Sequence, residues 1–328
     1  MPLQRYGVLK GRITQQIAGQ GESPHHQLHV IDDVADYRAA VNVKSQLAPS
    51  ELMFAIVDDF QHPLTEPLAR LPSGITELER RPGGLALDYI RGNLFGRPGL
   101  RTLPYAEVGP NNDLYEQLDA LVQRSIGDGG ATLYAFGEPW SAEARKDKYM
   151  GFFPGAGIHN VHMNQGNDPK YGGDDAPWQD GGLLFSFAAG KTQRWVAVFL
   201  AFQSQATHTD DVTGHTIPAP PARDGLVRIV AARLRPPKGQ PQTVTLLNTG
   251  AAPLDLAGWA LKDYRKTARP IAGALAPGAA LAVELAPADA FSPAGDLITL
   301  VDDLGLKIDG VAYGKRQVPG EGHTLVFA

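Results

Sequence analysis

Two short stretches of the chain are rich in imidazole and amide side chains. The first is SPHHQLH at residues 23–29, and the second is the glycine-flanked stretch HNVHMNQGN at residues 159–167. Imidazole is the side chain that most readily exchanges protons near neutral pH, and it is also a common metal ligand. Both stretches are therefore candidate parts of a catalytic or binding site.

Two further polar stretches end expected strands. Lys44-Ser45-Gln46 closes the strand that follows the first histidine group, and Gln203-Ser204-Gln205 closes an apolar strand downstream of His162. The repeated order of histidine, strand and polar ending predicts an internal duplication in which two half-sites converge.

That organisation resembles the phospholipase D-like fold, in which each half supplies one histidine. The resemblance implies that His25 and His162 are the catalytic residues, one attacking phosphorus and the other acting as general acid. Gln27 and Asn164 stand where that fold has lysine. The residues expected to hold the phosphate are Lys44, Ser45, His159, Asn164, Gln165, Asn167, Ser204 and Gln205.

The same residues also allow other interpretations. In a metal-dependent interpretation, His159 and His162, with Asp180 nearby, hold a divalent metal ion that activates water, which is the one cofactor considered. Alternatively, the amides of 159–167 only stabilise a turn, and the histidines of 23–29 only line a half-exposed strand. A Ser/His/Asp hydrolase is less well supported because the chain has no Gly-x-Ser-x-Gly motif.

Strands must position most of these residues. Alternating apolar and polar residues predict three strands between Tyr6 and Ser45, with His25, Gln27 and His29 on one face and His26 on the other. Apolar runs predict further strands at TLYAFGEPW, GGLLFSFAA and RWVAVFLAFQSQ, the last of them central in its sheet. Residues 112–127 predict an amphipathic helix that ends at Gly127. Residues 49–102 have no clear periodicity.

Composition sets the broad class of the chain. Its 328 residues suffice for two domains, and 37 glycines with 26 prolines indicate many short strands joined by turns. A net charge of −5 does not indicate any particular class of binding partner. The lack of cysteine excludes disulfides and thiolate sites. No signal peptide and no transmembrane segment is recognisable, so we expect a cytoplasmic protein, or one exported without a cleaved leader.

A proline-rich stretch marks an expected domain boundary. The stretch DDVTGHTIPAPPARD, residues 210–224, predicts a linker at 212–224 between an N-terminal domain, 1–211, and a C-terminal domain, 225–328. The second domain resembles the lamin-tail domain, an immunoglobulin-like sandwich, through TVTLLNTG, LAGWALKD with Trp259, GALAPG and ITLVDDLGLKIDGVAYG. That resemblance implies a binding or tethering module with a protein or surface partner.

The N-terminal region resembles the YukJ-like family of bacterial proteins, a domain of unknown function. The resemblance rests on YGVLKGR, SPHHQLHV, VNVKSQ, NDLYEQLDALVQRSI, GIHNVHMNQGN and RWVAVFLAFQSQ, spans residues 2 to about 211, and implies one domain before the linker. The expected fold is thus a β-rich α+β domain, with the phospholipase D-like arrangement as its finer form, followed by the all-β lamin-tail sandwich.

We expect a phosphodiester hydrolase, specifically a nuclease with nucleic acid as its partner, that uses paired histidines. Two alternatives stay open at this point: a non-enzymatic binding or scaffold protein for a polar ligand, and an exported effector hydrolase acting on cell-wall or lipid substrates.

Overall fold

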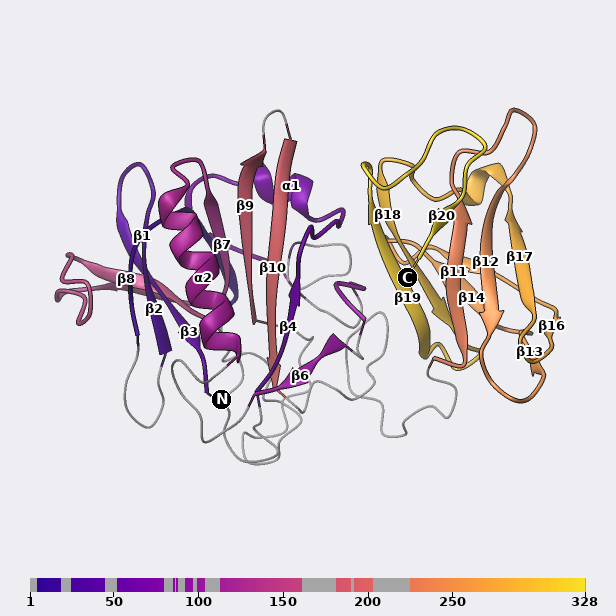
Figure 1. Ribbon diagram of the computed structural model, residues 1–328, viewed down its shortest axis with the longest axis horizontal. Coiled ribbons are helices and arrows are strands. Elements are labelled where there is room, and N and C mark those ends of the chain that lie inside the picture. The colour runs from indigo at the N-terminus through magenta and orange to yellow at the C-terminus, as the bar shows by residue number, and fades with distance from the viewer. Residues whose placement is uncertain are drawn as a thin grey trace. The chain divides into compact units, whose positions relative to one another are not determined.

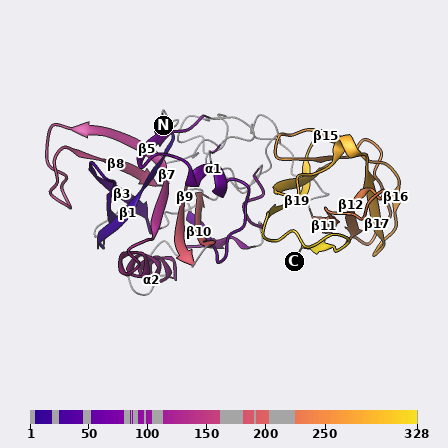
Figure 2. The same ribbon diagram turned by 90° about the horizontal axis from the view of Figure 1, so that it is seen from above.

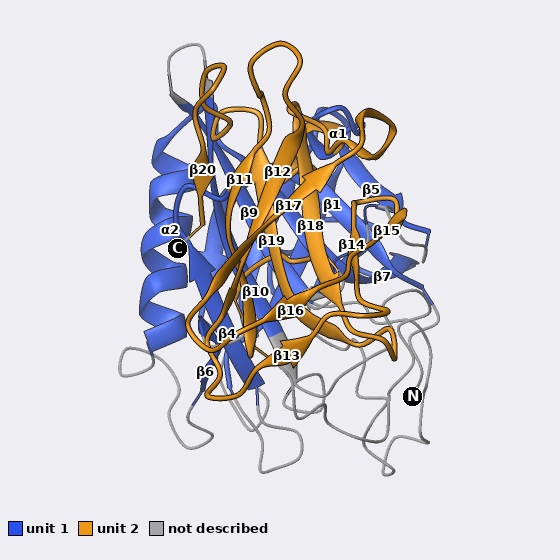
Figure 3. Ribbon diagram, turned by 90° about the vertical axis from the view of Figure 1, so that its right-hand side faces the viewer, with its two compact units in different colours: residues 1–60, 68–87, 97–206 blue, residues 61–67, 88–96, 207–328 orange. Residues whose placement is uncertain are grey.

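The computed structural model divides the chain into two compact units (Figure 3). Unit 1 contains residues 1–60, 68–87 and 97–206, and unit 2 contains residues 61–67, 88–96 and 207–328. Two segments from the first hundred residues thus group with the C-terminal part of the chain, which the expected linker did not suggest. The residues that the structure describes are 5–18, 25–44, 52–79, 85, 87, 92–96, 99–103, 113–160, 181–189, 192–202 and 225–327.

Unit 1 is built on one extended sheet (Figure 1). Its strand order is β5-β1-β2-β3-β8-β7-β9-β10-β4-β6, with a further pairing between β1 and β7. The described strands are β1 (Gly7–Ile17), β2 (His25–Ile31), β3 (Asp36–Asn42), β4 (Leu52–Val57), β5 (Gly74–Glu77), β6 (Arg101–Thr102), β7 (Thr132–Glu143), β8 (Gly155–Asn160), β9 (Gly181–Ala189) and β10 (Thr192–Phe202). The predicted strands at these positions are confirmed, and β10 is central as expected, between β9 and β4.

Five of these strands form a closed circuit. β1 pairs with β2, β2 with β3, β8 with β7, and β7 with β1, all antiparallel, whereas β3 pairs with β8 in parallel. β1 and β7 are long enough to take part twice: β1 pairs with β7 through residues 7–11 and with β2 through residues 12–17, and β7 pairs with β1 through residues 133–137 and with β8 through residues 138–143. The other edges of residues 7–10 and 132–136 pair with β5 and β9. The circuit therefore brings β2 and β8, more than a hundred residues apart in sequence, onto the two sides of β3.

The helix α2 (Asp113–Gly127) has the predicted limits and closes the core of unit 1. Leu114, Leu118 and Val122 are fully buried and join the apolar cluster formed by the inner residues of the strands, which include Leu28, Val41 and Ile158. The spacing of three and four residues places these side chains on one helix face. The only other described helix in unit 1 is the short α1 (Thr65–Ala69), whose first residues belong to unit 2.

Unit 2 is a β-rich unit with two four-stranded antiparallel sheets, β17-β12-β11-β20 and β15-β14-β18-β19, and a small β13-β16 pair. Both large sheets contribute to one core around Trp259 and Tyr313. Its elements are β11 (Val227–Arg233), β12 (Gln242–Asn248), β13 (Leu254–Asp255), β14 (Ala260–Lys262), β15 (Ala268–Pro270), β16 (Ala274–Leu275), β17 (Ala280–Leu285), η4 (Pro287–Asp289), β18 (Gly295–Val301), β19 (Lys307–Gly314) and β20 (Leu325–Val326).

Within unit 2, the segment 92–96 is fixed on β18 and β19 by one side chain. Asn93 is buried, and its Nδ2 donates to Ile298 O at 3.3 Å, Thr299 Oγ1 at 2.9 Å and Val311 O at 3.2 Å. Gly310 provides the space for this side chain, because a Cβ at that position would lie 2.1 Å from Asn93 Oδ1. A segment far from residues 225–328 in sequence thus completes the packing of this unit.

Candidate functional site

His25 of β2 and His159 of β8 meet on one face of the sheet. Their Nε2 atoms are 2.8 Å apart, and the ring centroids are 4.5 Å apart with the rings edge to face at 69°. Strand β3 lies between them: Ala40 is paired with Gln27 on one side and with His159 on the other. Because the Ala40 side chain is a single methyl group, the two imidazoles can reach each other above it.

The alternation of the sequence decides which side chains face this site. On β2, His25, Gln27 and His29 point away from the core, whereas His26 and the apolar residues between them point inward, as predicted. On β3, Asn42 is the residue paired with His25, and so it shares that outward face. The face of β2, β3 and β8 that carries the histidine pair is called the histidine face below.

A second polar group lies one row further along the histidine face. The Arg38 side chain donates to Gln27 Oε1 at 2.6 Å and to Asp147 Oδ2 at 2.7 Å, and its guanidinium lies over the Trp140 ring at 4.7 Å. Gly157, directly between Arg38 and Trp140 in the sheet, makes this possible, because a Cβ there would lie 2.4 Å from Trp140. The row is therefore a fixed arrangement of one cation, one carboxylate and one aromatic ring.

Electrostatics hold Asp147 ionised. Burial alone would raise the pKa of Asp147, but hydrogen bonds from Arg38 and from the backbone N–H groups of Met150 and Tyr149 outweigh it and keep the pKa below its usual range. The ion pair is well shielded from solvent, since the Arg38 and Asp147 side chains are 12% and 2% exposed. Asp147 thus holds the Arg38 guanidinium in a fixed position on the histidine face.

His26, the inward neighbour of His25, is set apart chemically. It is fully buried, contacts Gln16 Oε1 through Nε2, and lies 5.1 Å from the Tyr115 ring of α2. Burial lowers the pKa of His26 to about 4, although the Asp119 carboxylate acts in the opposite direction. A histidine that is neutral and enclosed in this way is part of the core packing. Of the two neighbouring histidines, His25 is therefore the candidate catalytic residue.

Glu138 is a member of the site that the sequence did not reveal. It is the β7 residue paired with His159, and directly opposed residues of antiparallel strands have Cβ atoms about 4.5–5.5 Å apart. A carboxylate beside an imidazole favours its protonated form and can fix its orientation. Four residues are thus paired side by side across the sheet, namely Gln27, Ala40, His159 and Glu138. His25 lies on the same face of β2, two residues before Gln27.

An imidazole pair of this kind has a defined chemistry. A hydrogen bond between two Nε2 atoms requires that one of them carries the hydrogen and the other accepts it. When the donating ring is also protonated on Nδ1, that imidazolium is an acid and its neutral partner is a base. Two charged rings at 2.8 Å would repel each other, and like-charged neighbours do not ionise together. The pair can therefore deliver one proton and accept another within the same small volume.

Comparison with known proteins places this site within a family. The family model described as "Uncharacterized conserved protein (DUF2278)" matches residues 1–214. The chain belongs to this family. The chain is also 38% identical over 215 residues to the "Uncharacterized protein YukJ" of Bacillus subtilis (strain 168). The aligned residues make up 64% of this chain and 93% of that protein. No solved structure matches the chain.

The matched region contains both histidines of the pair, whereas residues 215–328, the larger part of unit 2, lie outside it. The YukJ-like resemblance of the N-terminal part is thereby confirmed. Among the described helices, none is long and apolar enough to cross a membrane.

The structure places three of the predicted site residues. His25 and His159 come together, and Lys44 follows β3 two residues after Asn42, whose Oδ1 accepts a hydrogen bond from the Lys44 N–H at 3.2 Å. The predicted partner of His25 was His162, which lies outside the described residues, as do Ser45, Asn164, Gln165, Asn167, Asp180, Ser204 and Gln205. Their predicted roles, and the duplication that links them, stay predictions.

The metal site also stays a prediction. Of its three proposed ligands, only His159 is described. Within the described ranges there is no group of three or more His, Asp or Glu side chains arranged to hold a metal ion. The described part of the site is therefore a pair of imidazoles with polar neighbours.

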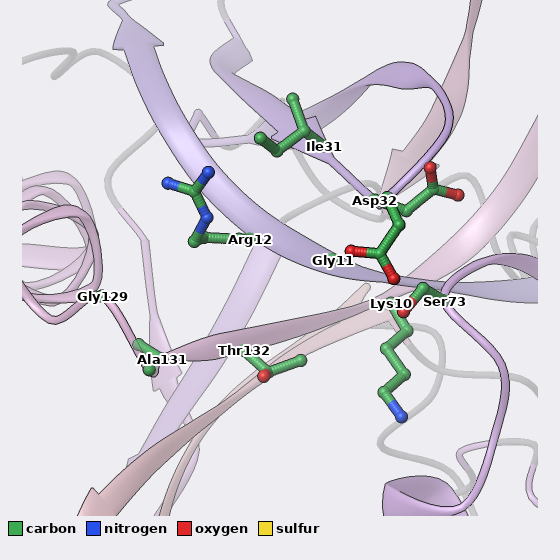
Figure 4. A pocket seen from close by; sticks show the side chains of 11 residues that line it. Lys10, Gly11, Arg12, Ile31, Asp32, Ser73, Gly129, Ala131 and Thr132 are labelled. Atoms are coloured by element: carbon green, nitrogen blue, oxygen red, sulfur yellow. The ribbon is translucent and has the colours of Figure 1, made fainter.

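A separate hollow of about 250 Å³ lies beside β1 (Figure 4). Two of its four charged side chains are held by backbone groups: Lys10 Nζ donates to Ala69 O at 2.8 Å and Leu71 O at 2.6 Å, and Asp32 Oδ1 accepts from Val34 N and Ala35 N. Burial lowers the pKa of Lys10. Because the lining of the hollow includes no histidine, whereas the histidine face brings two imidazoles into contact, the candidate site is the histidine face. The hollow is lined by Lys10, Gly11, Arg12, Ile31, Asp32, Asp33, Ser73, Gly129, Gly130, Ala131 and Thr132.

Proposed function

We propose that this protein hydrolyses phosphodiesters, and specifically that it is a nuclease in which His25 and His159 are the catalytic pair. The observation that carries the proposal is the 2.8 Å separation of their Nε2 atoms on an outward face beside a fixed cation, Arg38. Proton transfer by positioned imidazoles typically accelerates such reactions by about 10²–10⁴-fold.

In this proposal the pair starts as one imidazolium and one neutral imidazole, so that the reaction conserves protons. When a phosphodiester group enters between the rings, the neutral imidazole takes a proton from water, and the water oxygen attacks phosphorus. The bond from phosphorus to the leaving oxygen breaks, and that oxygen takes the proton of the other ring. After the products leave, the proton passes back across the Nε2–Nε2 hydrogen bond and restores the starting state.

The phospholipase D-like version of the proposal differs in one step. There one imidazole nitrogen attacks phosphorus itself, the leaving oxygen takes the proton of the other ring, and water then hydrolyses the phosphorus–nitrogen bond. In this version His162 supplies the second ring, and Lys44, Ser45, Asn164, Gln165, Asn167, Ser204 and Gln205 hold the phosphate oxygens. A phosphohistidine trapped by rapid denaturation would distinguish the two versions.

The metal-dependent version assigns different roles to the same region. His159, His162 and Asp180 would hold a divalent ion that activates the attacking water. Cleavage that requires Mg²⁺, Mn²⁺ or Zn²⁺ and stops in EDTA would favour it over the imidazole pair.

For unit 2 we propose the lamin-tail assignment, an immunoglobulin-like module without catalytic activity. Two four-stranded antiparallel sheets around one core are compatible with such a sandwich. A tether of this kind would raise the local concentration of the enzyme near DNA, a surface or a partner protein, and would offset the net charge of −5.

A second candidate function is binding without catalysis. The observation that favours it is the row of Arg38, Gln27, Asp147 and Trp140, in which the charged groups are already paired and the geometry is fixed before any ligand arrives. Such a face would recognise a polar ligand by shape and hydrogen bonding.

The test is cleavage of plasmid DNA and of RNA by the purified protein, with each divalent metal and with EDTA in parallel. Cleavage that persists in EDTA and is lost in His25→Ala and in His159→Ala supports the imidazole pair. Cleavage that is unchanged in both variants refutes it. Cleavage in EDTA that is lost only in His162→Ala assigns the second ring to His162, and no cleavage under any condition favours the binding function.

A further inference from the structure

The connection between β7 and β8 carries an unusual set of side chains. This hairpin tip, residues 144–154, projects from the body of unit 1 (Figures 1 and 2). Among the described residues, five large apolar side chains are exposed, and the only aromatic ones are Tyr149, 38% exposed, and Phe153, 65% exposed, both on this tip. Exposed aromatic rings are costly in water, and their concentration on one projecting tip indicates a contact surface.

The tip is also basic once its internal pairs are counted. Its carboxylate Asp147 is held by Arg38, and Arg145 pairs with Glu143 at the end of β7. Lys146 and Lys148 are exposed, and neither forms an ion pair within the described part of the chain. The Lys148 ammonium lies 4.9 Å from the Tyr149 ring. Two uncompensated ammonium groups therefore accompany the two exposed rings.

The tip is tied to the histidine face. Asp147 anchors it to Arg38, and the Arg38 guanidinium also lies 5.0 Å from the Tyr149 ring. Phe152 stacks on His29 of β2, with centroids 5.4 Å apart and the rings within 10° of parallel. His29 is four residues from His25 on the same strand face, a span of about 13 Å. A ligand held at the tip would thus continue along β2 toward the histidine pair.

The strand order of unit 1 independently supports a binding surface formed by the 144–154 tip and the histidine face. The closed circuit β1-β2-β3-β8-β7 has three antiparallel strands in succession, a return strand β8 parallel to β3, and closure of β7 on β1. This is the strand order of the five-stranded Greek-key barrel called the OB-fold, which binds oligonucleotides or oligosaccharides on its strand 2–3 face and on the loop between its last two strands. In this chain those two places are the histidine face and the 144–154 tip.

We propose that the 144–154 tip and the histidine face together bind single-stranded nucleic acid, with bases stacked on Tyr149 and Phe153 and phosphates beside Lys146 and Lys148. Aromatic stacking combined with basic groups is the usual means of holding unpaired strands, because a duplex does not expose the faces of its bases. The inference rests on the proposed function, since it names the substrate that the histidine pair would cleave. It favours nucleic acid over an oligosaccharide because the lysines complement phosphates.

The test uses the full chain with His25→Ala, so that binding is measured without cleavage. Fluorescence anisotropy with a labelled 15-nucleotide dT strand, a U strand of equal length and a 15-base-pair duplex gives the three affinities. We expect both single strands to bind at least tenfold more tightly than the duplex. Phe153→Ala should weaken single-strand binding about tenfold, the range reported for one stacked base.

Matched variants separate the contributions. Lys146→Gln with Lys148→Gln should weaken binding and reduce its salt dependence, because fewer phosphate counterions are released. Leu304→Ala and Lys238→Gln, exposed residues of unit 2, are the controls and should leave binding unchanged. Circular dichroism of each variant checks folding, and Phe153→Ala is informative here because its side chain is 65% exposed.

Equal affinity for duplex and single strand, or unchanged binding in Phe153→Ala, would overturn the proposal. Tighter binding of a chito-oligosaccharide, lost in the same variant, would replace nucleic acid by a glycan. Single-strand binding without any cleavage by the unmodified protein would leave this inference standing and end the hydrolase proposal. Cleavage that is insensitive to the tip variants would end this inference and leave the hydrolase proposal standing.

Discussion

His25 and His159 are hydrogen-bonded through their Nε2 atoms at 2.8 Å, although 134 positions separate them in the sequence. The contact exists because β3 pairs with β2 on one side and with β8 on the other, and because the residue between the histidines is Ala40. A larger side chain at that position would stand between the rings.

Gly157→Ala should destabilise unit 1 by about 1–3 kcal/mol, the usual cost of overpacking. The added Cβ would lie 2.0 Å from Arg38 O and 2.4 Å from Trp140 Cζ2, so the backbone or the indole ring must move. Urea unfolding followed by tryptophan fluorescence measures the change. Gly129→Ala is the control, because nothing lies within 4 Å of its Cβ, and equal stability of the two variants would contradict this packing.

Asp147→Asn should cost about 3 kcal/mol, because it leaves the Arg38 guanidinium shielded from solvent without its carboxylate. The pKa of Asp147 is lowered in the folded state, so its contribution is present above the unfolded value near 4 and is lost as the pH falls below it. The difference in unfolding free energy between the natural protein and the variant should therefore shrink as the pH falls below about 4. A difference that is independent of pH would contradict the assigned ionisation.

His26 should make unit 1 sensitive to mild acid. Its pKa is about 4 in the folded state and about 6.5 when unfolded, so the unfolded chain binds the additional proton between these values. Stability is fully present above about pH 6.5 and falls by about 3 kcal/mol as the pH drops toward 4. The unfolding free energy of His26→Leu, subtracted from that of the natural protein at each pH, isolates this effect from that of His62, whose pKa burial also lowers to about 4. A difference in unfolding free energy that does not change with pH would show that His26 is not buried in its neutral form.

Asn93→Ala should destabilise unit 2 by about 2 kcal/mol. The variant loses three hydrogen bonds to the Ile298, Thr299 and Val311 positions, and the buried acceptors lose their donor. Differential scanning calorimetry measures the thermal unfolding transitions, with exposed Gln240→Ala as the control. An unchanged transition would mean that residues 92–96 do not contribute to the packing of unit 2.

Local patterns predicted much of unit 1. Strict alternation placed His25 and His26 on opposite faces, and the helical spacing of Leu114, Leu118 and Val122 gave α2 its correct limits. Residues 49–102 resisted prediction because proline and glycine interrupt the pattern, and there the structure has the short elements β4, α1, β5 and β6.

The partner of His25 could not be read from the sequence. The two halves of the pair meet through a parallel pairing of β3 with β8, and no local pattern encodes contacts across more than a hundred residues. Glu138 was missed for the same reason, since only the register of β7 against β8 reveals that it faces His159. The aromatic tip at 144–154 had a local signal that could have been noticed: the sequence ARKDKYMGFFP places basic residues directly before three aromatic ones.

The most direct test of the account is a double-mutant cycle on strand cleavage. The rates of the natural protein, His25→Ala, His159→Ala and the double variant are measured in EDTA, with exposed His323→Ala as the control. If the two imidazoles act as one unit, each single variant loses about 100-fold or more, and the double variant is no slower than the singles. Full activity in either single variant, or losses that multiply in the double variant, would contradict the central claim that His25 and His159 work as a pair.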